Sequence, residues 1–137
     1  MREVFIDTNI LFDLLLEREP HTSYANHFFE YAIKNDIVLN TCSFSYATLY
    51  YVLRKKLTHE NVIHDLGWLS KLTKCLSVNE KVVKQALESQ FRDFEDALQY
   101  FCALQVSGCE AIITRNAKDF KLSVLPVVSP EFFLGNI

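Results

Sequence analysis

The sequence predicts an α/β fold in which a parallel β-sheet is covered by helices on both faces. Short apolar runs alternate along the chain with longer segments whose apolar residues recur at helical spacing, which is the pattern of successive β–α units. Half of the 137 residues are apolar, with only three glycines and three prolines. This composition favours a sizeable core without flexible linkers. We therefore expect residues 1–137 to form a single domain.

Five short segments have the length and composition of buried strands: residues 4–6, 37–39, 75–78, 111–114 and 127–128. Most are apolar runs without polar alternation, which is typical of strands covered on both faces.

Helical spacing of apolar residues marks the segments between these strands. In the first half of the chain, one helix begins after Asn9 as N-cap and is closed by Pro20. The other helices expected there are residues 24–32, 43–56 and 58–72. The basic run 54–56 suits a helix C-terminus.

In the second half of the chain, Asn79 and Asp93 each stand before an apolar helical pattern and predict helices over residues 79–87 and 93–102. Gly108 stands where the second of these would stop. Pro130 precedes a short terminal helix.

Charge and cysteine content narrow the class of protein. Seventeen acidic residues oppose fourteen basic ones, and this net charge of −3 lacks the basic footprint usual in nucleic-acid binders. No C-x-x-C pair is present, which argues against a zinc site. The cysteines lie in apolar stretches and predict reduced core thiols: Cys42, Cys75, Cys102 and Cys109. With no signal peptide and no membrane span in view, we expect a cytoplasmic protein.

Aspartates gather where the predicted strands end. Asp7 directly follows the first strand, and Asp93 and Asp96 lie three residues apart at the start of the helix before the fourth strand. The polar residues after the fourth strand are Thr114, Arg115, Asn116, Lys118 and Asp119. Because sites in parallel α/β sheets form at the carboxyl ends of strands, we expect these segments to share one cleft.

Clustered carboxylates repel one another unless a cation joins them. Mg²⁺ takes one or two carboxylates, keeps several waters and often accepts phosphate oxygens. Such a site activates water for phosphodiester cleavage, with Arg115 and Lys118 placed to hold a phosphate backbone. The simpler alternatives are that Asp7 and Asp93 cap helices, that Asp96 faces a helix dipole and that Asp119 belongs to a turn.

Three motifs together resemble those of the PIN domain family. They are Val-Phe-Ile-Asp-Thr-Asn-Ile-Leu at residues 4–11, Asp-Phe-Glu-Asp-Ala-Leu-Gln at residues 93–99, and Ile-Thr-Arg-Asn-Ala-Lys-Asp-Phe at residues 113–120. Their order and spacing match the family over nearly the whole chain.

The resemblance implies a three-layer α/β/α sandwich around a parallel sheet, and ribonuclease activity that depends on Mg²⁺ or Mn²⁺. Asp7 matches the first family acid, Asp96 the third, Asn116 the fourth position and Asp119 an additional acid, while Thr114 would help to orient the site. Many small members are VapC-type toxins that form homodimers and are inhibited by an antitoxin protein.

One position departs from the family pattern. The second acid is usually a glutamate early in the helix after the second strand, and Thr48 occupies that position here. A hydroxyl is a neutral ligand and does not replace a charge, so we expect weaker metal binding. Asp93 is the nearest candidate to compensate.

Three functions remain open from the sequence. The first is a metal-dependent endoribonuclease in which Asp7 and Asp96, with Asp93 or Asp119, hold the metal. The second is a PIN-fold module with negligible turnover that binds RNA or a protein partner, which Thr48 favours. The third is an aspartyl phosphatase using Asp7, which is disfavoured because Asn9 stands where such enzymes place a second acid.

Overall fold

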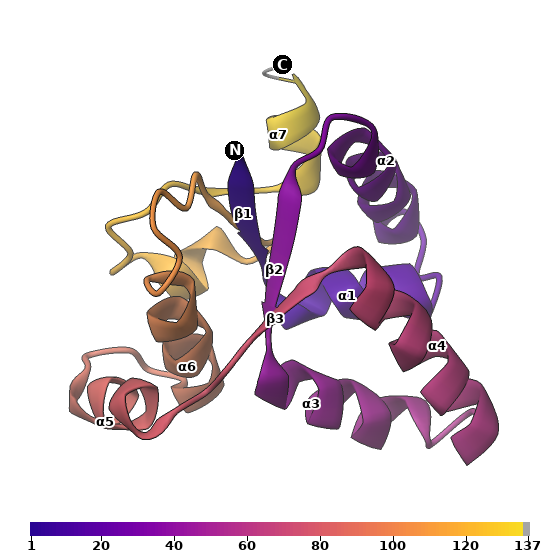
Figure 1. The fold of residues 1–137 in the computed structure, drawn as a ribbon, viewed down its shortest axis with the longest axis horizontal. Helices are drawn as coiled ribbons and strands as arrows, with labels where there is room; N and C mark the ends of the chain where they lie inside the picture. The colour runs from indigo at the N-terminus through magenta and orange to yellow at the C-terminus, as the bar shows by residue number, and fades with distance from the viewer. Residues whose placement is uncertain (136–137) are drawn as a thin grey trace.

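The computed structural model describes residues 1–135, which form a three-layer α/β/α sandwich (Figure 1). One parallel five-stranded sheet has the order β3-β2-β1-β4-β5. Its strands are β1 (Glu3–Ile6), β2 (Val38–Cys42), β3 (Lys74–Leu76), β4 (Ile112–Ile113) and β5 (Val127–Val128). The helices are α1 (Thr8–Leu15), α2 (His21–Lys34), α3 (Ser43–Leu53), α4 (His59–Leu72), α5 (Glu80–Glu88), α6 (Phe94–Ala103) and α7 (Pro130–Gly135), with a 3₁₀ helix η1 (Ala117–Phe120). The predicted fold class is confirmed.

Strand β1 lies at the centre of the sheet. It pairs in parallel with β2, where Glu3 opposes Val38, and with β4, where Ile6 opposes Ile113. Helices α5 and α6 lie on one side of the sheet, and α1 to α4 lie on the other (Figure 1). Side chains alternate between the two faces of a strand. Accordingly, Val4 and Ile6 pack in the core under α1 to α4, whereas Phe5 packs in the core under α5 and α6.

The first helix begins and ends earlier than its sequence pattern predicts. Its N-cap is Asp7 and not Asn9, so the helix starts directly at the end of β1. It ends at Leu15, and Pro20 is the N-cap position of α2 instead of the closing residue of α1. The early start matters for function, because it leaves no loop between β1 and α1 and fixes Asp7 at the junction.

Three further expectations are corrected. Helix α3 ends at Leu53, so the basic run 54–56 lies in the turn after it. Helix α6 ends at Ala103, and Gly108 takes its left-handed φ of 72° in the turn that follows. Cys75 is exposed, because β3 is an edge strand, while the other three cysteines are buried free thiols. No helix within residues 1–135 has the length and apolar character needed to cross a membrane.

Candidate active site

A cleft of about 520 Å³ lies beside the start of α6 and collects several of the predicted site residues. Its lining includes Asp93 and Asp96 from the start of α6, and Lys118 and Asp119 from η1. Two segments about twenty residues apart in sequence thus contribute charged groups to one cavity. The cleft lining thus includes four of the residues predicted to share one cleft, whereas Asp7, Thr114, Arg115 and Asn116 are not part of it.

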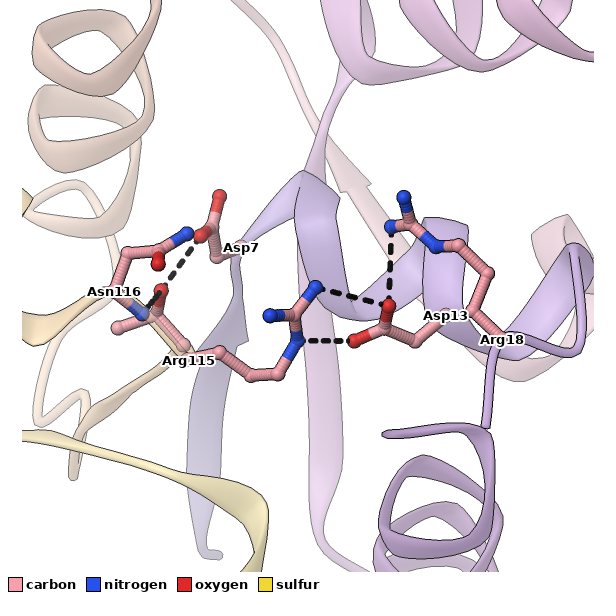
Figure 2. Close-up of polar contacts among 6 residues, drawn as sticks. Asp7, Asp13, Arg18, Arg115 and Asn116 are labelled. Carbon is pink, nitrogen blue, oxygen red and sulfur yellow. Dashed lines mark hydrogen bonds and ion pairs between the residues drawn. The ribbon is translucent and has the colours of Figure 1, made fainter. Parts of the chain in front are cut away.

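Asp7 is only 2% exposed, at the end of the central strand. Both of its carboxylate oxygens accept hydrogen bonds: Thr114 Oγ1 donates to Oδ2 at 2.6 Å, and Gln99 Nε2 donates to Oδ1 at 2.9 Å. Figure 2 shows Asp7 facing the segment that follows β4. Although Asp7 occupies the N-cap position of α1, its side chain makes no capping hydrogen bond. The carboxylate is therefore held by two side chains from distant parts of the sequence, Thr114 just after β4 and Gln99 on α6.

Two carboxyl groups of the site, Asp7 and Asp96, have a raised pKa. Burial raises the pKa of Asp7, and the hydrogen bonds from Thr114 and Gln99 oppose that effect. Burial, followed by the charges of Asp93, Asp7 and Asp119, raises the pKa of Asp96 to about 7. A carboxyl that titrates near neutral pH among other carboxylates marks a position where a cation would be strongly favoured.

Asp93 is the N-cap of α6. Its Oδ1 accepts a hydrogen bond from the Asp96 backbone N–H at 3.0 Å. This is the helix-capping role that the sequence analysis gave as an alternative. This bond also places the Asp93 charge directly beside Asp96.

Two residues after β4, Thr114 and Asn116, belong to the hydrogen-bond chain of Asp7. Thr114 is buried and orients Asp7, so it does not line the cleft as a substrate contact. The backbone N–H of Asn116 donates to Thr114 Oγ1 at 3.0 Å, which couples Asn116 to the same hydrogen-bond chain.

Arg115 points away from the cleft, contrary to the sequence-based expectation. Its Nε and Nη2 donate to the two carboxylate oxygens of Asp13, at 2.6 and 3.1 Å (Figure 2). Asp13 is fully buried and also pairs with Arg18 at 3.0 Å. The physical reason for the difference is that a bidentate bond to a buried carboxylate outweighs exposure to solvent. Arg115 thereby ties the segment after β4 to α1.

Sequence reasoning missed Gln99 and Asp13. Both are polar residues within apolar helical patterns, and both are buried. That signal was present: Asp13 interrupts the apolar face of α1, and Gln99 stands three residues after Asp96, on the same face of α6. Gln99 lies 92 residues from its partner Asp7, and Asp13 lies 102 residues from its partner Arg115, so these pairings could not be predicted from the sequence.

Thr48 lies half-buried on α3, and its hydroxyl donates to the Phe44 carbonyl at 3.4 Å. Ser45, one helical turn earlier, contacts Thr8 Oγ1 at 2.8 Å. Residues three apart share a helix face. Thr48 therefore lies on the face of α3 that meets the residue next to Asp7.

Comparisons with known proteins identify the family of the chain. The chain is 29% identical over 136 residues to ribonuclease VapC1 of Aquifex aeolicus (strain VF5), covering 96% of this chain and 92% of that protein. The VapBC-1 structure of nontypeable Haemophilus influenzae matches with a TM-score of 0.71 at 20% identity, over 94% of this chain and 98% of the matched chain. Mycobacterium tuberculosis VapC20, described as a Sarcin-Ricin loop cleaving toxin, matches with a TM-score of 0.63 at 17% identity, over 80% of this chain and 86% of the matched one. The family model of the PIN domain matches residues 3–118, and the chain therefore belongs to the PIN domain family.

Proposed function

We propose that this protein is a metal-dependent endoribonuclease and the toxin of a toxin–antitoxin pair, acting through a single PIN domain over residues 1–137. The observation that carries the proposal is the convergence of Asp7, Asp96, Asp93 and Asp119 at one end of the sheet, where burial, followed by the charges of the other three, raises the pKa of Asp96 to about 7. Support also comes from the relative that is named a ribonuclease and from the neighbour described as a Sarcin-Ricin loop cleaving toxin.

The donor set fits Mg²⁺ or Mn²⁺. Every candidate ligand is a carboxylate or amide oxygen, which hard divalent cations prefer. Among residues 1–135, no group of three or more His, Cys, Asp or Glu side chains is close enough to hold a metal by itself. Mg²⁺ does not need such a group, since it binds through one or two carboxylates and keeps its remaining waters. Asp7 and Asp96 supply those two carboxylates.

The roles of the protein groups follow from their contacts. Asp7 and Asp96 would hold the metal, and Asp93 and Asp119 would add negative charge beside it. When bound, the metal supplies Lewis-acid stabilisation and a water of lowered pKa. Thr114 keeps the Asp7 carboxylate oriented, and Asn116 would orient ligands or water. Lys118, which lines the cleft, is the cation we assign to RNA phosphate. We do not assign that contact to Arg115, because Asp13 engages its guanidinium.

A second function has a specific observation in its favour. Thr48 leaves the site without one family acid, and the raised pKa of Asp96 weakens its charge at neutral pH when no cation is bound. Both features favour a PIN-fold module that binds RNA or a protein partner with little turnover.

The partners and location that we propose follow from the family. We propose an antitoxin protein as the inhibitor, a homodimer as the assembly and the cytoplasm as the location.

The test is RNA cleavage by purified protein, with Mg²⁺ or Mn²⁺ and with chelator. We expect cleavage that needs the cation and falls by at least about a hundredfold in Asp7→Asn. Asp36→Asn is the matched control, because Asp36 is exposed and its left-handed φ of 55° suits asparagine. Equal cleavage by wild type and Asp7→Asn would refute the assignment. Cation-dependent RNA binding without cleavage would favour the second function.

A further inference from the structure

Gln99 is buried on α6, the helix that carries Asp96, and contacts Asp7 at the end of β1. Its exposure is 2%, and it lies three residues after Asp96 on α6. We propose that Gln99 is a positioning residue that fixes the Asp7 carboxylate and sets its spacing from Asp96. The proposal rests on the proposed function, since it concerns the same metal-binding carboxylates.

The orientation of the Gln99 amide is determined by its neighbours. The Thr8 backbone N–H lies 2.9 Å from Oε1, and a backbone N–H can only donate. The atom facing Thr8 must therefore be the amide oxygen. Thr8 Oγ1 donates to the same oxygen at 2.9 Å. With the oxygen so held, the amide nitrogen is turned toward Asp7 Oδ1 and donates to it at 2.9 Å.

This arrangement makes the Asp7 carboxylate an acceptor on both sides. Gln99 occupies one oxygen and Thr114 the other, so rotation of the carboxylate breaks at least one bond. Both donors stabilise the ionised form, which is the form that a cation needs. Each oxygen of a carboxylate keeps a second lone pair for a ligand.

Gln99 also connects the elements that carry the family's acid positions. Asp96 and Gln99 share one face of α6, so the bond to Asp7 ties Asp96 to the end of β1. Through Thr8 Oγ1 the chain of hydrogen bonds continues to Ser45 at 2.8 Å, on the face of α3 that also bears Thr48. A single amide thus links β1, α1 and α6 directly and α3 through one hydroxyl.

The experiment compares wild type, Gln99→Met and Gln105→Met. Methionine has nearly the shape of glutamine but cannot donate to Asp7. Gln105, just beyond the end of α6, is the matched control. It is exposed, and its side chain donates to the Ser77 carbonyl and makes no bond to Asp7. Mn²⁺ affinity is measured by calorimetry, and kcat and KM are measured on RNA. Melting temperatures report folding separately.

We expect Gln99→Met to bind Mn²⁺ at least about tenfold more weakly, as is usual when the residue that orients a metal ligand is lost. We expect kcat to fall while KM for RNA changes less than about twofold, because Gln99 is buried and does not touch the substrate. Gln105→Met should match wild type in both measurements.

Wild-type Mn²⁺ affinity and kcat in Gln99→Met would overturn the inference and leave the proposed function standing. A wild-type protein that binds no Mn²⁺ would overturn both. If Gln99→Met does not fold, Gln99→Asn serves instead, because it keeps the amide but is one methylene shorter. Its expected loss of Mn²⁺ affinity is again about tenfold, and unchanged affinity would refute the inference.

Discussion

The ion pair between Arg115 and Asp13 predicts a large loss of stability when it is broken. Arg115→Met removes both hydrogen bonds to a carboxylate that is fully buried on α1 (Figure 2). The remaining partner is Arg18, which makes one contact at 3.0 Å and whose side chain is 44% exposed. The substitution therefore leaves a buried charge with only partial compensation.

The expected magnitude follows from this geometry. Removing one partner of a buried ion pair typically costs about 3–5 kcal/mol, and the remaining Arg18 places Arg115→Met near the lower end, at about 3 kcal/mol. For a chain of this length, that corresponds to a fall in melting temperature of about 10 °C. Arg18→Met removes a single contact from a side chain that is 44% exposed and should cost about 1 kcal/mol or less.

The assay is urea and thermal unfolding of wild type, Arg115→Met, Arg18→Met and the double variant Asp13→Asn/Arg115→Met. The double variant removes the buried charge together with its partner, so it should recover part of the stability lost in Arg115→Met. An Arg115→Met variant no less stable than Arg18→Met would refute the claim that the bidentate pair holds the segment after β4 against α1.

Two further predictions concern the carboxylates. The pKa of Asp96 is about 7 in the folded protein, against an ordinary value of 3.8. The protonated carboxyl therefore adds its full contribution to the free energy of unfolding below pH 4, and this contribution is lost as the pH rises through 7. Asp96→Asn should therefore raise the metal-free melting temperature more at pH 8 than at pH 5, and an equal effect at both would contradict the pKa. Thr48→Glu should raise Mn²⁺ affinity several-fold by calorimetry, because it adds a carboxylate on the face of α3 next to Thr8; no change would show that residue 48 does not face the metal.

The sequence was sufficient for the architecture because its signals are local. Most strands contain a short apolar run, and most helices have their own periodicity, so the order of elements can be predicted without knowing which contacts form. Element ends were less accurate. Asn9 and Asp7 are both good N-cap types, and only the hydrogen bond from Ile10 N–H to the Asp7 carbonyl, at 3.0 Å, shows where α1 begins.

Part of the site could be predicted as well, because some of its signals are also local in the sequence. Asp7 and Asp96 stand at a strand end and at a helix start, where chain topology alone brings them to one edge of the sheet. Gln99 and Asp13 were not readable, because their roles depend on partners some hundred residues away. The prediction that Arg115 lies at the cleft was wrong, because it relied on the position of its sequence neighbours. Its sequence neighbours, including Lys118, lie at the cleft, while its own side chain turns back to α1.

The central claim is that Asp7 and Asp96 together hold a divalent cation. The most direct measurement is an anomalous difference map from crystals of this protein soaked in Mn²⁺. We expect a peak within about 2.5 Å of a carboxylate oxygen of both Asp7 and Asp96. A map with no Mn²⁺ peak at these two residues, or with Mn²⁺ bound only elsewhere on the protein, would contradict it.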